Sequence, residues 1–415
     1  LLLLLLLLLL LLLLLLTPCL FQIFLLGVAL QLVCLPVRFA ADGAFVGLAG
    51  NNSLVIRPPA DGQVLIDGAD FRALVAKVQA LEQQLDEQQC TTVSDTTSIT
   101  GLRGSDKWVG GVLAGNGKIY GIPWDTGSVL IIDPTTNTAD TTTITGLSGS
   151  VKWRGGVLAD NGKIYGMPHS STSVLIIDPT TDTADTTTIA GLGGSGKWYG
   201  GVLAGNSKIY GIPSISTSVL IINPTTDTAD TTTITGLMSG GDKWRGGVLA
   251  DTGKIYGIPC SSTSVLIIDP TTNTADATTI TGLSDGSNCK WDGAVLAGNG
   301  LIYGVPMSSV SVLIIDPTTN TVDTTSITGL SGNNKWNGGV LAGNGLIFGI
   351  PLNSASVLVI DPSTDTADVT TITNLSGSIK WTGGVLASNG KIYGIPYDPA
   401  SVLIVQSGCM LIRGL

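Results

Sequence analysis

One segment, opened by a Lys-Trp pair, recurs from residue 107 to the end of the chain. The tryptophans that open its copies are spaced 45 to 47 residues apart. A fixed period of this length indicates a structural unit repeated in tandem, because each copy buries its apolar face against its neighbours. The seven tryptophans are Trp108, Trp153, Trp198, Trp244, Trp291, Trp336 and Trp381. The repeat therefore constrains the possible folds more than any other feature.

Each copy predicts four short strands. In the first copy these are residues 110–114, 118–123, 128–133 and the Thr-rich 141–147. Asn116-Gly117 favours a tight hairpin turn between the first two strands. Asp133-Pro134 ends the third, because proline has no amide hydrogen for the ladder. Four strands in 40–45 residues are typical of one β-propeller blade.

The two ends of the array predict how it closes. The last copy stops after its third strand, and the missing fourth-strand sequence appears at residues 95–102, before the first tryptophan. An open solenoid would instead need distinct capping repeats. We therefore predict an all-β protein, a seven-bladed β-propeller over residues 90–409, in which an N-terminal strand completes the last blade.

The repeat also resembles a known type. The stretch KIYGIPxxSxSVLIIDPTTNTADTTTITGL is similar to the YVTN-type repeat of surface-layer and YncE-like propellers. The Tyr strand reads IYGIP rather than YVTN, and the KWxGG opening is not part of that pattern. The resemblance implies the propeller fold; it implies no single function, because such propellers host many unrelated activities.

Four segments flank the predicted propeller. Residues 1–41 are hydrophobic, with no charge before Arg38, and predict a signal peptide or membrane anchor. Residues 42–69 form a linker or small β patch. Asp70 is expected to cap a helix over residues 70–89, whose 3-4 apolar spacing is typical of a coiled coil; it would pack on the propeller or form an oligomerising stalk. Residues 410–415 form a tail.

The six cysteines predict two disulfides. Cys90 and Cys409 flank the two strands that would meet at the closure, and Cys260 and Cys289 lie in neighbouring loops. Paired cysteines would place the protein in an oxidising compartment, secreted or anchored outside the cell. The alternatives are free thiols, or Cys90 bridging two chains. Asn51 and Asn374 begin possible glycosylation sequons.

Two positions vary freely among otherwise constant copies. The residue after each Trp and the residue after the Pro of each second strand are expected to surround the mouth of the central channel. A constant scaffold with one variable face indicates a binding surface, although neutral variation in loops would look the same. The candidate binding residues are Trp124, Arg154, His169, Tyr199, Arg245, Asp292, Asn337 and Tyr397.

The Lys-Trp pairs lie on the same predicted face. We expect each Trp to wedge between blades, since large aromatics dominate core packing, and each Lys to be solvated. The alternative is a channel-mouth ring of aromatic and cationic groups that receives a glycan or an anionic polymer. The Asp-rich turns at 133–140 and its equivalents are expected to be turn formers.

Catalysis has little support in the sequence. His169 is the only histidine, and the only glutamates, Glu82 and Glu87, precede the propeller. The formal charge of −10 argues against nucleic acid, whose binders carry basic surfaces. We predict no metal and no cofactor, and a non-catalytic propeller that recognises protein or carbohydrate, or serves in a surface layer. The alternative is a lactonase-like hydrolase or lyase acting at the channel mouth.

Overall fold

The computed structural model describes residues 19–26, 29–39, 45–48, 54–57, 64–66, 69–70, 92–284 and 288–408. The chain divides into two compact units, Leu1–Gln89 and Cys90–Leu415. Each unit is described by itself below.

The N-terminal unit contains a sheet of four strands and a separate pair. β1 (Cys19–Leu26) pairs antiparallel with β2 (Ala29–Phe39), followed in the sheet by β5 (Val64–Ile66) and β6 (Ala69–Asp70). β3 (Phe45–Leu48) pairs with β4 (Leu54–Arg57). The described part of the expected signal or anchor therefore forms a hairpin. No helix among the described residues is long and apolar enough to span a membrane. The expected helix after Asp70 lies outside the described residues.

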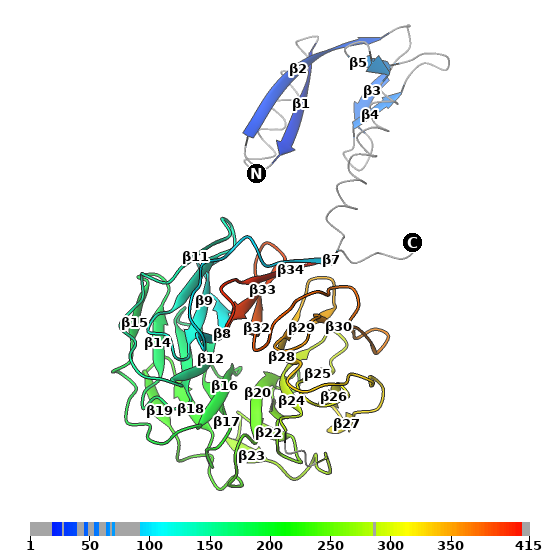
Figure 1. The fold of residues 1–415 in the computed structure, drawn as a ribbon. Coiled ribbons are helices and arrows are strands. Elements are labelled where there is room, and N and C mark those ends of the chain that lie inside the picture. Colours follow the sequence, from blue (N-terminus) through cyan, green and yellow to red (C-terminus); the bar gives the residue numbers. More distant parts are fainter. Residues whose placement is uncertain are drawn as a thin grey trace. The chain divides into compact units, whose positions relative to one another are not determined.

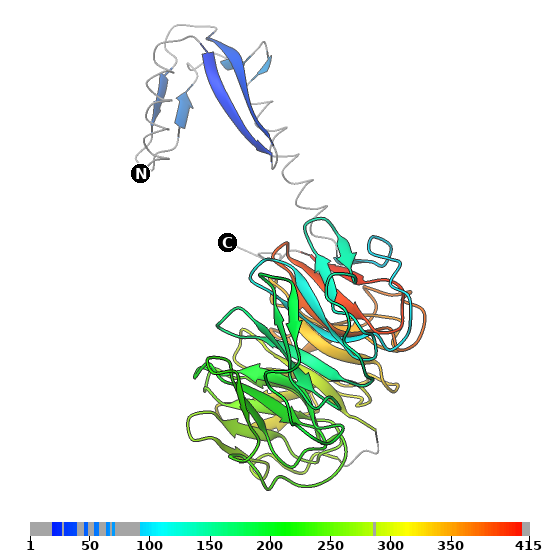
Figure 2. The ribbon, with the colours of Figure 1, turned by 90° about the vertical axis from the view of Figure 1, so that its left-hand side faces the viewer.

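The second unit is a ring of seven four-stranded antiparallel sheets (Figure 1), and Figure 2 shows it at right angles. The innermost strands are β8 (Trp108–Leu113), β12 (Trp153–Leu158), β16 (Trp198–Leu203), β20 (Trp244–Leu249), β24 (Trp291–Leu296), β28 (Trp336–Leu341) and β32 (Trp381–Leu386). The second strands are β9 (Ile119–Pro123), β13 (Ile164–Pro168), β17 (Ile209–Pro213), β21 (Ile255–Pro259), β25 (Ile302–Pro306), β29 (Ile347–Pro351) and β33 (Lys391–Pro396).

The outer half of each blade is shorter. The third strands are β10 (Leu130–Asp133), β14 (Leu175–Asp178), β18 (Leu220–Asn223), β22 (Leu266–Asp269), β26 (Leu313–Asp316), β30 (Leu358–Asp361) and β34 (Leu403–Ser407). Six blades end with β11 (Thr138–Asp140), β15 (Thr183–Asp185), β19 (Thr228–Asp230), β23 (Thr274–Asp276), β27 (Thr321–Asp323) and β31 (Thr366–Asp368). In the seventh, β7 (Thr92–Asp95) pairs with β34, which confirms the all-β seven-bladed propeller with N-terminal strand closure.

The Thr-rich stretch is not the fourth strand, and here the sequence prediction was wrong. The outer strand of the first blade ends at Asp140, whose carboxylate accepts hydrogen bonds from the Thr142 amide at 2.6 Å and the Thr142 hydroxyl at 2.7 Å. This local turn competes with further strand pairing and diverts the chain. The segment then crosses to the next blade and buries Ile144 in the core there. β7 likewise ends at Asp95, so the closing strand precedes the predicted 95–102 segment.

Seven hydrophobic clusters form the core, each made of side chains from two adjacent blades. Every repeat tryptophan belongs to one of them and is at most 3 % exposed. Trp108 packs against Ile395 and Tyr393 of the last blade, and its indole nitrogen donates to the Ser128 carbonyl at 2.8 Å. The tryptophans therefore wedge between blades, as expected, and do not form an open ring at the channel mouth.

The paired lysines are buried, not solvated as the sequence suggested. The seven are 2–5 % exposed. In the first copy the Lys107 ammonium donates to the carbonyls of Gly104, Tyr397 and Asp398 at 2.7–2.9 Å. It also lies 5.9 Å from the centre of the Trp108 ring. A buried charge is tolerated only when it is fully hydrogen-bonded. Through these hydrogen bonds the lysines link the loops of one blade to those of the next.

A second set of side chains links blades near the opposite ends of the inner strands. Each second-strand tyrosine donates its hydroxyl to an Asn or Asp in the outer turn of the following blade, at 2.5–2.9 Å. These bonds are Tyr120–Asp182, Tyr165–Asp227, Tyr210–Asn273, Tyr256–Asn320, Tyr303–Asp365 and Tyr393–Asn137. The one exception, Phe348, faces the blade that β7 completes, where no such hairpin turn exists. The change from Tyr to Phe therefore marks the closure.

The inner strands approach one another through glycine. Each glycine of one ring has positive φ, and a Cβ on it would lie 3.1–3.4 Å from the Cα of its neighbour. The ring consists of Gly110, Gly155, Gly200, Gly246, Gly293, Gly338 and Gly383. Because the inner strands touch one another at these glycines, the residue before each glycine lies beside the central axis.

Candidate binding face

We define the Trp-side face as the loops that precede each repeat Trp together with those that follow each second strand. Since strands alternate in direction, both loop types emerge at the same end of a blade. The residue after each second-strand Pro lies in these loops, and the residue after each Trp is the second residue of an inner strand, next to them. Of the five exposed large apolar side chains among the described residues, four lie in these loops: Ile215, Met238, Val310 and Ile379.

Side chains from blades that are not adjacent meet at the axis. The Tyr199 hydroxyl donates to Asp292 at 2.7 Å, and the Asn337 amide donates to the same carboxylate oxygen at 2.9 Å. Arg245 completes the cluster at 3.3 Å from that oxygen. Burial raises the pKa of Tyr199 to about 12, so the phenol stays protonated and remains a donor. The sequence predicted that these four residues surround the channel mouth. In the structure they form one hydrogen-bonded network.

Arg154 lies beside this network but outside it. Its guanidinium carbon is 3.8 Å from the centre of the Tyr199 ring and 5.0 Å from that of Trp124. Its Nε is buried without a hydrogen-bond partner, and the whole residue is half-buried. No ion pair joins Arg154 to a carboxylate within the part of the chain that the structure describes. A cation held between two aromatic rings and otherwise unpaired is available to an incoming anion.

The remaining predicted residues surround Arg154. Trp124 contacts the His169 ring at 4.9 Å between centroids, and His169 is half-buried. Burial, reinforced by the charge of Arg154, lowers the pKa of His169 to about 4, which leaves its ring neutral at pH 7. Tyr397 is half-buried, and burial together with Asp106 raises its pKa.

Burial separates these candidates into two groups. Trp124, Tyr199, Asp292 and Asn337 are 2–8 % exposed and the side chain of Arg245 is 11 % exposed, whereas Arg154, His169 and Tyr397 are half-buried. The first group builds the floor of the face, and its truncation would cost core packing. Variants that probe ligand contact are therefore best placed in the second group and in the surrounding loops.

A third variable position was missed in the sequence. It is the residue before each Lys-Trp pair, and it adopts positive φ in six copies: Asp106, Val151, Gly196, Asp242, Asn334 and Ile379. Asp242 pairs with Arg245 at 3.0 Å and accepts from the Ser214 hydroxyl at 3.0 Å. Val151 and Ile379 are β-branched, so this conformation is strained there. Comparing the residue that precedes each Lys-Trp pair among the copies would have revealed this third variable position.

Cys260 and Cys289 form a disulfide on this face, as predicted from their loops, with 4.2 Å between their Cα atoms. Cys260 is one of the variable residues and is 1 % exposed. Cys90 and Cys409 lie outside the described residues, as does Asn51. Asn374, the other sequon position, is exposed in a loop of this face.

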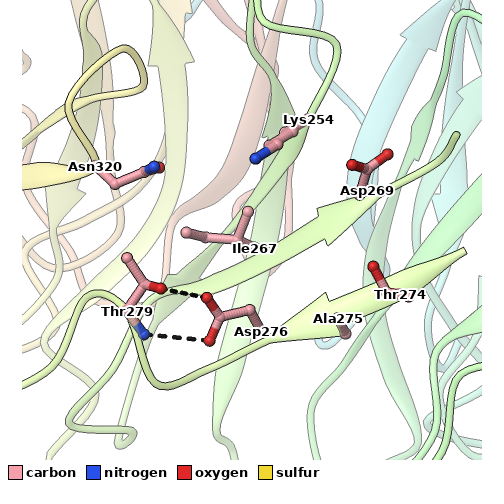
Figure 3. A pocket seen from close by; sticks show the side chains of 8 residues that line it. All are labelled: Lys254, Ile267, Asp269, Thr274, Ala275, Asp276, Thr279 and Asn320. Carbon is pink, nitrogen blue, oxygen red and sulfur yellow. Dashed lines mark hydrogen bonds between the residues drawn. The ribbon is translucent and has the colours of Figure 1, made fainter. Parts of the chain in front are cut away.

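The cavities of the ring described next are lined by residues other than the binding candidates. One of about 180 Å³ lies between the fourth and fifth blades, lined in part by Lys254, Asp269, Asp276, Thr279 and Asn320 (Figure 3). The Asp276 carboxylate accepts from both the amide and the hydroxyl of Thr279. An equivalent cavity occurs at the preceding junction. Its repetition, and the internal pairing of its polar groups, indicate that it belongs to the blade architecture.

A larger cavity of about 340 Å³ opens among the Trp-side loops of the fifth and sixth blades. Its lining includes Gly332, Asn333, Asn353 and Ser354. Across the described residues, no three His, Cys, Asp or Glu side chains gather as a metal site would require.

Comparisons with known proteins extend only to the fold. No protein-family model matches the chain, and no curated protein sequence matches it. Similar solved structures include a virginiamycin B lyase from Staphylococcus aureus, with a TM-score of 0.62 and 8 % identity over 75 % of this chain and 98 % of that one. The extracellular domain of a putative one-component system from B. thetaiotaomicron gives a TM-score of 0.54 and 10 % identity. There the match covers 75 % of this chain and 42 % of that one. At these identities the likeness shows the propeller fold.

Proposed function

We propose that this protein is a non-catalytic recognition propeller that binds a protein or carbohydrate ligand on its Trp-side face, in the secreted or surface-anchored state. The observation that carries the proposal is Arg154, which lies over the rings of Trp124 and Tyr199 and forms no ion pair with a carboxylate of the described residues. Variation at three loop positions on one constant scaffold supports it. Aromatic and arginine side chains are the types that supply most binding energy at interfaces.

Two further observations agree with this proposal. Val151 and Ile379 keep strained backbones at the same loop position, and strain of about 1–3 kcal/mol per residue is most often retained at functional sites. The Cys260–Cys289 disulfide ties two loops of the face together and suits an oxidising compartment. The YVTN-like repeat and the likeness to the extracellular domain of a putative one-component system support the same location.

The experiment that tests the face uses a matched pair of glycans in one blade. Ile215→Asn, with Thr217, creates a sequon on the Trp-side face at a side chain that is 44 % exposed. Thr226→Asn, with Thr228, creates one on an exposed turn at the opposite end of the same blade. Both full-length variants, made in a glycosylating host, are compared with the unaltered protein on arrays of glycans and of secreted proteins.

We expect the glycan at position 215 to abolish binding to the arrayed ligand and the glycan at position 226 to leave it intact. The first glycan shields the face from a large ligand, whereas the second does not. Retention of binding by both variants, loss in the Thr226 variant alone, or failure of the unaltered protein to bind any spot would contradict the proposal.

A lyase- or lactonase-like hydrolase is the second candidate, and His169 favours it. Its neutral ring could accept a proton at pH 7, and the Ser170 hydroxyl lies 3.3 Å from its Nδ1. General acid–base catalysis also needs an orienting partner, and no carboxylate bonds His169 among the described residues. Binding is therefore ranked first. Turnover distinguishes the two: an enzyme would convert its ligand and lose that conversion in His169→Asn, whereas a recognition module would leave the bound ligand chemically unchanged.

A further inference from the structure

We infer that the Trp-side face captures a single carboxylate group, and that Arg154 is the residue that binds it. This inference rests on the proposed function and names the chemistry of the ligand. It starts from the contrast between the two arginines at the axis. Arg245 is neutralised by Asp242 at 3.0 Å and by Asp292 at 3.3 Å. Arg154 has neither contact.

The surroundings of Arg154 are aromatic. Trp124 and Tyr199 flank its guanidinium, and His169 is neutral at pH 7. These neighbours fix the plane of the guanidinium through cation–π contacts and offer it no negative charge. The Nε atoms of Arg154 and Arg245 are both buried without a hydrogen-bond partner, so the two arginines differ only in whether a carboxylate pairs with the guanidinium.

The charge of the face limits what the ligand can be. Asp242 lies near Arg154, and Asp106 and Asp125 lie near Tyr397. The whole chain carries a formal charge of −10. One unpaired arginine among these carboxylates matches one negative charge, and the aspartates would repel a phosphate, a sulfate cluster or a polyanion. The planar guanidinium binds two oxygens of an acid group through parallel hydrogen bonds, in a carboxylate as in a phosphate, so the single negative charge is what favours a carboxylate here.

A carboxylate could come from an acidic sugar or from a peptide-like molecule. We therefore name two probes and their neutral counterparts. Sodium D-glucuronate is compared with D-glucose, and N-acetylglycine with N-acetylglycinamide. Each is titrated calorimetrically into the full-length protein. A preference for glucuronate over N-acetylglycine assigns the carboxylate to a sugar, and the reverse assigns it to a peptide terminus.

Three variants accompany the titration. Arg154→Gln removes the charge, and Arg154→Lys keeps the charge but loses the planar fork. Lys208→Gln removes one charge at the opposite end of the third blade, in the turn between β16 and β17. We expect carboxylate affinity to fall at least about tenfold in Arg154→Gln, because charge-assisted bonds are lost. It should fall less in Arg154→Lys and stay unchanged in Lys208→Gln.

Equal binding of glucuronate by Arg154→Gln and the unaltered protein overturns the inference, as does the absence of binding by both carboxylates. Thermal unfolding of each variant shows whether it is folded; if Arg154→Gln is not, the Arg154→Lys result decides. The sequon experiment distinguishes a failure of the carboxylate assignment from a failure of the proposed binding face. If the glycan at position 215 blocks the array ligand while Arg154→Gln still binds it, the face is a binding site and the carboxylate assignment is wrong.

Discussion

The ring of glycines around the axis predicts a stability difference that two alanine substitutions can measure. Gly246 has φ of +72°, and a Cβ there would lie 3.1 Å from the Cα of Gly293 and 3.5 Å from its amide nitrogen. Gly253, in the first hairpin turn of the same blade, has φ of +77° and nothing within 4 Å of that position. The two glycines thus share a left-handed backbone conformation that would be strained for alanine, and they differ in the space available to a Cβ.

The expected loss of stability follows from the φ angle at each glycine and from the distance between the added Cβ and the neighbouring backbone. Alanine in the left-handed region costs roughly 1–2 kcal/mol, and this term is common to Gly246→Ala and Gly253→Ala. Only Gly246→Ala adds a methyl group against backbone, which cannot turn aside like a side chain. Overpacking of this kind costs about 1–3 kcal/mol more. We therefore expect Gly246→Ala to lower the free energy of unfolding by about 2–5 kcal/mol, against about 1–2 kcal/mol for Gly253→Ala.

The assay is denaturant unfolding of the full-length protein, followed by tryptophan fluorescence, since each buried repeat Trp reports the packing between two blades. Midpoints at constant slope give the difference in stability directly. Equal destabilisation of the two variants would refute the reasoning, because it would mean that the inner strands can separate at the axis at little cost.

Two further predictions concern ionisation and covalent closure. Because the pKa of His169 falls from its usual 6.5 to about 4 in the folded chain, the unfolded chain binds more protons between these values, so stability should fall as pH drops from 6.5 to 4. His169→Asn should flatten that part of the profile measured by thermal unfolding; an unchanged slope would contradict the assignment. A non-reducing peptide map of secreted protein should link Cys90 to Cys409 within one chain, since the pairing of β7 with β34 reaches Thr92–Ser407, two residues short of each cysteine. A Cys90 link between chains, or free thiols, would contradict it.

The repeat determined most of the architecture. The spacing of the tryptophans and the offset of one strand between the two ends predicted seven blades and their closure, because a period of this length has few packed solutions. The Cys260–Cys289 pairing followed from the same register. The change from Tyr to Phe at residue 348 was visible as well, but its meaning depends on the neighbouring blade, which only the structure identifies.

The sequence was wrong where local hydrogen bonds compete with strand pairing. Thr-rich composition favoured a strand over 141–147, but the Asp140 carboxylate binds the Thr142 amide and ends the strand there. Amino-acid composition shows which secondary structures a segment tolerates. It does not show which hydrogen-bond acceptor lies close enough to bind a given backbone amide. The lysines were misjudged for a related reason. Their carbonyl partners come from residues distant in the chain, such as Tyr397 for Lys107, and no local pattern reveals them.

By itself, then, the sequence determined the repeat, the number of blades and the positions that vary, because these depend on periodicity along the chain. Tertiary structure alone decided what the variable residues do. Arg154 and Arg245 occupy equivalent positions in the repeat, yet Arg245 meets Asp242 and Asp292 while Arg154 meets two aromatic rings. That difference is set mainly by side chains of the neighbouring blades, Trp124 and Tyr199 around Arg154 and Asp292 beside Arg245, which come within reach only when consecutive blades pack against one another.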